Sequence, residues 1–134
     1  MRELRIKAKV ENINIVTDFV NEVLEEIDCP MKAQLQIDVA LDELFSNIAQ
    51  YAYDAPGGEA VIRVEAAEAG GVCITFMDRG RPFDPLARPD PDISSGAEDR
   101  EIGGLGIFLV KKTMDDVRYA YAEGQNILRI YKRF

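Results

Sequence analysis

One long helix constrains this chain more than any other feature. From Met31 to Tyr53 the apolar residues recur at helical spacing, and they form a stripe that must face a core: Ile37, Leu41, Leu44, Ile48 and Ala52. Glu43 and Asn47 are four residues apart beside this stripe, so they lie one above the other. Their oxygens suit a hard cation such as Mg²⁺, and a carboxylate there could deprotonate a hydroxyl. The alternative is a polar pair on a solvated flank.

The composition is that of a globular protein with one core. The chain has 134 residues, of which 47% are hydrophobic and 30% charged, so residues 1–134 are predicted to form a single domain. A formal net charge of −8 argues against non-specific nucleic-acid binding and against docking on anionic lipid. Nucleotide binding stays open, because a helix end can attract phosphate locally.

Missing residue types exclude several kinds of site. The chain has no histidine, and neither of its two cysteines belongs to a CxxC pair. A zinc site and a Ser-His-Asp triad are therefore not expected. No run of apolar residues is long enough to span a membrane, and the basic amino terminus is not followed by one, so no signal peptide is predicted either. The expected compartment is the cytoplasm.

The remaining periodicities predict an α+β fold. A first helix is expected from Ile13 to about Cys29 and a third from Gly103, whereas alternation predicts five strands, over residues 4–10, 60–66, 72–76, 116–122 and 126–132. The order is β, α, α, β, β, loop, α, β, β. Because hairpins join antiparallel strands, we expect a mainly antiparallel mixed sheet with helices on one face, which is a two-layer α/β sandwich.

A long loop interrupts this pattern at about residues 79–103. It contains Pro82, Pro85, Pro89 and Pro91, with Asp, Ser and Gly filling much of the remainder. A loop of this length inside a compact domain is usually functional or mobile. We expect it to act as a lid over a site.

Two corners flank that loop. Asp78 ends a strand and Gly80 follows two residues later, so the carboxylate could accept a hydrogen bond from a base amine such as that of adenine, with the glycine close to a flat ring. The alternative is an ordinary turn. Gly103-Gly104-Leu105-Gly106 begins a helix, where backbone N–H groups could bind an anion. The alternative there is a flexible hinge, because neither a Walker loop nor a dinucleotide fingerprint is present.

The joint order of these pieces identifies a family. The chain resembles the GHKL (Bergerat-fold) ATP-binding domains, and more narrowly the anti-sigma regulatory factor serine/threonine kinases, which include RsbW and SpoIIAB. The resemblance covers nearly the whole chain. Three blocks carry it: residues 41–53 (LDELFSNIAQYAY), 78–85 (DRGRPFDP) and 103–111 (GGLGIFLVK).

The resemblance implies roles for the residues of the long helix and of the first corner. Asn47 would ligate Mg²⁺, and Glu43 would be the general base or would orient the attacking hydroxyl. Asp78 would bind the adenine amine, with Gly80 beside the ring.

The resemblance also implies a phosphate site, an activity and partners. Gly104, Leu105 and Gly106 would meet the phosphates of ATP, and residues 84–102 would close as the lid. Members transfer the γ-phosphate to a serine or threonine of an anti-anti-sigma protein of the STAS fold, bind a sigma factor, and often form homodimers. Two alternatives stay open: an ATP-dependent binding switch without catalysis, and an interaction domain with a relic site.

One departure and one gap remain. Many members carry histidine where this chain has Tyr51, which bears on the helix end and its contacts. The cation that stabilises the transferring phosphoryl group is not assigned; its candidates are Arg79, Arg81, Arg88, Arg100, Lys111 and Lys112.

Overall fold

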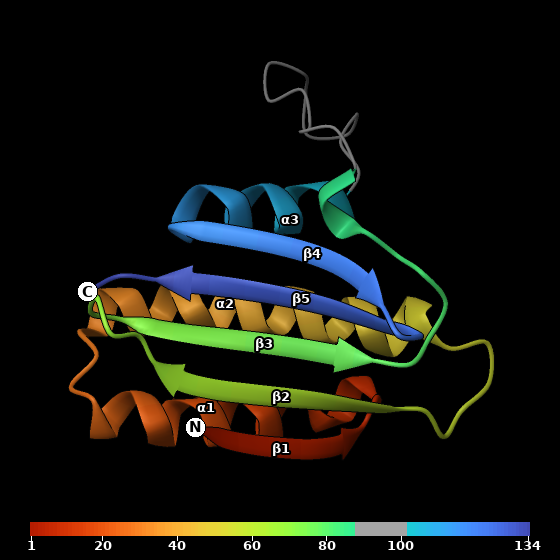
Figure 1. Cartoon of the computed structure of the whole chain (residues 1–134), viewed down its shortest axis with the longest axis horizontal. Helices are drawn as coiled ribbons and strands as arrows, with labels where there is room; N and C mark the ends of the chain where they lie inside the picture. Colours follow the sequence, from red (N-terminus) through yellow and green to blue (C-terminus); the bar gives the residue numbers. More distant parts are fainter. Residues whose placement is uncertain (88–101) are drawn as a thin grey trace.

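Five strands form one sheet in the computed structural model, which describes residues 1–87 and 102–134 (Figure 1). The strand order across the sheet is β1-β2-β3-β5-β4. The strands are β1 (Arg2–Lys7), β2 (Glu59–Ala66), β3 (Val72–Asp78), β4 (Asp116–Ala122) and β5 (Gln125–Lys132). The five predicted strands and their order along the chain are confirmed. β1 lies at an edge of the sheet, where alternating lysines and arginines discourage pairing with other chains.

The sheet is antiparallel at every neighbouring pair of strands, which confirms the predicted mainly antiparallel sheet and leaves no parallel pair among the described strands. The reason lies in the last hairpin. The chain passes from β3 through a helix into β4, which runs in the same direction as β3 but sits at the edge. The β4–β5 hairpin then returns β5 in the opposite direction between them.

Three helices lie on one face of the sheet and complete the predicted two-layer sandwich (Figure 1). They are α1 (Ile13–Glu26), α2 (Met31–Asn47) and α3 (Ile102–Thr113). The core between the layers includes the fully buried side chains Leu24, Ile37, Leu41, Phe45, Ile62, Ile74, Phe76 and Ile130. None of the helices in the described ranges is both long and apolar enough to cross a membrane.

The long helix has the predicted extent but changes its geometry near its end. After α2 ends at Asn47, residues Ile48–Ala52 form one wider turn with π-helical hydrogen bonding. Turns of this kind are uncommon and occur often at functional sites. This π-turn brings Ala52 to the loop that follows β3, as described below.

Two stretches of the segment expected to act as a lid, residues 79–103, have regular structure. Pro85–Ala87 form a turn of 3₁₀ helix, and α3 already begins at Ile102, so Ile102 and Gly103 are helical. Residues 88–101 lie outside the described part of the chain. The glycines of the second corner thus lie within the first turns of α3. Glycine disfavours helix, but tertiary packing can override this local preference.

Candidate functional site

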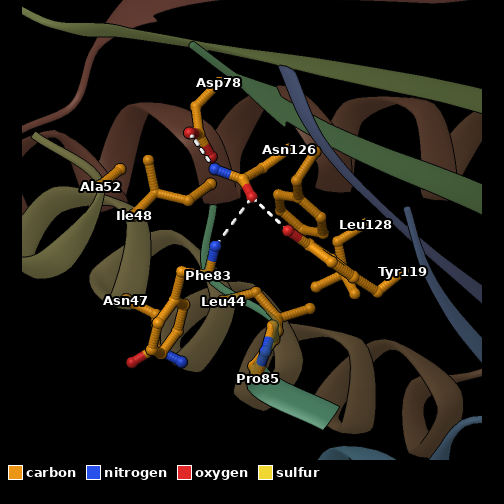
Figure 2. Close-up of a pocket in the computed structure, with 11 residues that line it drawn as sticks. Leu44, Asn47, Ile48, Ala52, Asp78, Phe83, Pro85, Tyr119, Asn126 and Leu128 are labelled. Atoms are coloured by element: carbon orange, nitrogen blue, oxygen red, sulfur yellow. Dashed lines mark hydrogen bonds between the residues drawn. The ribbon is translucent and has the colours of Figure 1, made fainter. Parts of the chain in front are cut away.

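A pocket opens between the end of α2 and the ends of β3, β4 and β5 (Figure 2). It holds about 400 Å³, counting the part open to solvent. Its walls are mostly apolar, with a few polar groups that converge on it, which is the usual make-up of a small-molecule site. The lining residues used below are Leu44, Asn47, Asp78, Phe83, Tyr119 and Asn126.

Asp78 is the buried carboxylate of this pocket, with 6% of its surface exposed. Its Oδ1 accepts hydrogen bonds from the Gly80 N–H and from Asn126 Nδ2, each at 2.9 Å. Both bonds use the same oxygen, so within the described residues Oδ2 remains an acceptor for a ligand. Burial raises the pKa of Asp78 above the ordinary carboxyl value, and these two donors oppose that rise.

Gly80 lies against the π-turn at the end of α2. A Cβ built on Gly80 would fall 2.1 Å from the carbonyl oxygen of Ala52, so only glycine allows this approach. The next residue fixes the contact, because the Arg81 N–H donates to the same carbonyl at 2.9 Å. The structure therefore gives Gly80 a packing role, and its predicted place beside a base ring stays a prediction.

Two tyrosines hold the end of α2 against the first corner. The ring of Tyr51, which stands where many members have histidine, stacks on Phe83 with 5.7 Å between centroids. The hydroxyl of Tyr53 donates to the Glu59 carbonyl at 2.6 Å and accepts from the Arg79 N–H at 2.9 Å. Tyr51 therefore supports one wall of the pocket.

Sequence reasoning missed Asn126, the residue that links most of the pocket's polar groups. It is 5% exposed and bonds to Asp78 and Tyr119 and to the backbone at residues 81 and 83. A signal was available: Asn126 shares the inward face of its strand with Leu128 and Ile130, where an amide is out of place. The partly apolar outer face of that strand concealed this pattern.

Glu43 and Asn47 lie one turn apart on α2, and they face different neighbours. Asn47 lines the pocket, and its side-chain amide has no hydrogen-bond partner within the described residues. Glu43 is directed at α3: a Cβ built on Gly106 would fall 2.1 Å from Glu43 Cδ and Oε2. The carboxylate is therefore held against the first turns of α3.

The first turn of α3 offers unpaired backbone donors near Glu43. The N–H groups at the start of any α-helix lack an intrahelical acceptor, and in α3, which begins at Ile102, those of residues 102–104 are among them. Gly104 belongs to this set and Leu105 follows it directly, so their predicted contact with phosphates stays a prediction. Gly106 lies beyond this set, and its visible role is to make room for Glu43.

We expect Gly106→Ala to lower phosphotransfer without lowering the melting temperature. The methyl group would overlap the Glu43 carboxylate, so that carboxylate must move away from α3. The carboxylate is the far end of a flexible side chain, and alanine favours a helix over glycine by about 1 kcal/mol, so the fold should not lose stability. Single-turnover transfer assays and thermal melts measure the two effects. A fully active Gly106→Ala protein would contradict this account.

The donor set of the pocket fits an adenine nucleotide with Mg²⁺. Asp78 Oδ2 is an acceptor suited to an exocyclic amine, and the Asn47 amide, which has no partner within the described residues, would supply one oxygen ligand. Mg²⁺ usually takes only one or two protein ligands and completes its shell with phosphate oxygens and water. Within the described residues no group of three or more acidic, Cys or His side chains could hold a metal ion.

The structure assigns no cation to the transferring phosphoryl group. Arg81 is engaged at the helix end, where its Nε donates to the Tyr51 carbonyl at 2.9 Å. Lys112 Nζ lies 5.4 Å from the centroid of the Phe108 ring. Arg88 and Arg100 lie outside the described residues. This role therefore stays open among the predicted candidates.

Comparison with known proteins shows to which family this chain belongs. A model of the histidine kinase-like ATPase domain matches residues 6–132. The chain belongs to the histidine kinase-like ATPase domain family. Its relatives include the serine-protein kinase RsbW of Bacillus thuringiensis strain Al Hakam, 29% identical over 134 residues, a match that spans 94% of this chain and 81% of the relative. RsbW of Bacillus anthracis strain CDC 684 is 29% identical over 130 residues, with the same coverage.

Solved structures share the fold of this ATPase domain. The RsbU and RsbW domains of Rv1364c from Mycobacterium tuberculosis match with a TM-score of 0.65 at 18% identity, over 99% of this chain and 32% of that one. The mycobacterial sensor histidine kinase MprB matches with a TM-score of 0.56 at 16% identity, over 99% of this chain and all of that one. The predicted resemblance to RsbW-like proteins is confirmed, and the predicted enzyme class, a serine/threonine protein kinase, agrees with the names of the sequence relatives.

Proposed function

We propose that this chain is an ATP-dependent serine/threonine protein kinase and anti-sigma factor. It phosphorylates an anti-anti-sigma partner of the STAS fold and sequesters a sigma factor in the cytoplasm, as a homodimer. The kinase part rests on the family and on relatives named serine-protein kinases. The partners and the dimer rest on the resemblance of the three sequence blocks.

One observation carries the proposal: a buried carboxylate and an amide line the same pocket, and a second carboxylate lies one helical turn from that amide. Asp78 lies deep in the pocket, Asn47 lines it, and Glu43 lies one helical turn from Asn47, against the start of α3. Such a line allows the base, metal and phosphates of one nucleotide to be bound by groups that are already in place.

The chain's own residues would then divide the work. Asp78 holds the base, Asn47 holds Mg²⁺, and the N–H groups of Gly104 and Leu105 lie at the positive end of α3, which favours phosphate. ATP, when bound with Mg²⁺, supplies the phosphoryl group. Glu43 accepts the proton of the serine or threonine hydroxyl, or orients that hydroxyl for attack.

Two measurements on the intact chain test the proposal. Mg·ATP at about a hundred times its Kd should stabilise the fold by about 2.7 kcal/mol, seen as a rise in melting temperature. A partner captured with this chain as bait should then gain phosphate on serine or threonine when Mg·ATP is added, measured by intact mass. Absence of any stabilisation by Mg·ATP would contradict the proposal. A partner that binds in a nucleotide-dependent way but stays unmodified would favour the non-catalytic switch.

A further inference from the structure

We propose that Asn126 is the positioning residue of the base-binding pocket, which fixes the orientation of the Asp78 carboxylate and ties residues 81–83 to it. This inference rests on the proposed function, because it takes Asp78 to be the group that reads the base. It goes further by giving a role to a strand residue outside all three sequence blocks. The close-up shows Asn126 between Asp78, Phe83 and Tyr119 (Figure 2).

The position of Asn126 in the sheet is unusual for its residue type. Asn126 pairs directly with Asp78 across β3 and β5, and it is 5% exposed. Asparagine is depleted in strands, and burying its amide is unfavourable unless every polar atom finds a partner. A buried amide in the lining of a pocket therefore points to a role beyond packing.

All four hydrogen bonds that an amide side chain can make are present. Nδ2 donates to Asp78 Oδ1 at 2.9 Å and to the Arg81 carbonyl at 2.8 Å. Oδ1 accepts from the Phe83 N–H at 3.0 Å and from the Tyr119 hydroxyl. The Arg81 carbonyl can only accept and the Phe83 N–H can only donate, so the amide has one possible orientation.

This fixed amide determines how Asp78 meets a ligand. Its N–H and that of Gly80 converge on Oδ1, so the carboxylate cannot rotate without losing both bonds. Oδ2 is thereby held toward the pocket as an acceptor. Burial raises the pKa of Asp78 and the Asn126 donor counteracts it, so removing that donor should protonate Asp78 at higher pH.

The same amide also holds the wall of the pocket. Its bonds to Arg81 and Phe83 fix the backbone on both sides of Pro82, and Phe83 itself lines the pocket while stacked on Tyr51. The acceptor for the base and the apolar wall beside it are thus joined through a single side chain. A change at Asn126 should therefore alter base selectivity as well as affinity.

Asn126→Asp tests this with little change of shape. The substitution keeps the acceptor for Phe83 and Tyr119 but places a second carboxyl against Asp78. At about pH 8 both cannot ionise without repulsion, so we expect ATP affinity to fall by about tenfold or more, measured by calorimetry. Acidification should restore it, because one shared proton replaces the lost donor. The Tyr119 and Tyr53 hydroxyls face Asp78, and burial raises the pKa of both, so neither titrates in this range.

A second variant and a control keep the test decisive. If Asn126→Asp does not fold, Asn126→Ala is the second variant. Its ATP affinity should fall on acidification at a higher pH than that of the wild type, and it should discriminate less between ATP and ITP, which lacks the base amine. Asn14→Asp is the control, because it makes the same chemical change on the exposed surface of α1 and should behave as wild type.

The outcomes separate this inference from the proposed function. Wild-type protein that fails to bind ATP would overturn both. The positioning role alone would be overturned if the wild-type protein binds ATP and the Asn126 variants have the same pH profile of ATP affinity and the same ratio of affinities for ATP and ITP. The positioning role would be supported if only the Asn126→Asp protein loses ATP affinity at pH 8 and regains it on acidification.

Discussion

Glu43→Gln is expected to abolish phosphotransfer while leaving ATP binding largely intact. A general base contributes about 10²- to 10⁴-fold to the rate of proton transfer, and glutamine cannot accept the hydroxyl proton. Glutamine has nearly the same shape, so it should still fit in the space that Gly106 leaves open. Single-turnover transfer to the partner and calorimetric titration with ATP measure the two properties separately.

The neighbouring carboxylate provides the matched control. Asp42 precedes Glu43 on α2 but is exposed, so Asp42→Asn removes the same charge from the other side of the helix and should transfer phosphate at the wild-type rate. Full transfer by the Glu43→Gln protein would rule out the catalytic role of Glu43. Loss of ATP binding in that protein would instead make Glu43 part of the nucleotide site.

Asp78→Asn should produce a protein that binds ATP much more weakly yet melts at a higher temperature. Oδ1 must remain an acceptor, because the N–H groups of Gly80 and Asn126 both point at it. The new NH₂ group must therefore face the pocket, where it opposes the amine of adenine. Loss of a hydrogen bond to a charged group is worth about 1.5–3 kcal/mol, or roughly ten- to a hundredfold in affinity.

The stability change follows from the sign of the pKa shift. Burial raises the pKa of Asp78 in the folded state, so its contribution to stability is present when it is protonated and is lost as pH rises through the folded-state pKa. A neutral asparagine avoids that loss. The gain in melting temperature should be greatest at neutral pH and should shrink on acidification.

A surface substitution controls for the change of charge. Asp54 is exposed and forms a 3.4 Å ion pair with Arg81, which contributes little because it is open to solvent. Asp54→Asn should therefore change neither ATP affinity nor melting temperature appreciably. An Asp78→Asn protein that binds ATP as tightly as the wild type would show that Asp78 does not read the base.

Periodicity predicted the fold well because each element has one clear face. The helical stripe of α2 and the alternation of the strands depend only on nearby residues, so element order and layer arrangement followed from the sequence. The sheet's uniformly antiparallel pairing did not follow, because it depends on which strands become neighbours. No local pattern distinguishes β5 beside β3 from β4 beside β3.

The site was predictable to the extent that local patterns contain it. Glu43 and Asn47 share a helix, and Asp78 ends a strand before a glycine, so their candidacy rested on sequence alone. The need for glycine at position 106 could not be predicted from local sequence, because it arises from the contact between α2 and α3. The part played by Asn126 likewise depends on strand pairing with Asp78, across 48 residues of chain.

The position of β5 has a consequence for how the protein is made. A ribosome releases β1, α1, α2, β2 and β3 before β5, yet β5 lies between β3 and β4 in the finished sheet. Until it emerges, β3 remains an unpaired edge open to other chains, and Asp78 lacks the partner that steadies it. Nascent chains should therefore be unable to bind ATP until nearly all of this domain has been translated. During that interval aggregation and chaperone binding compete with correct folding.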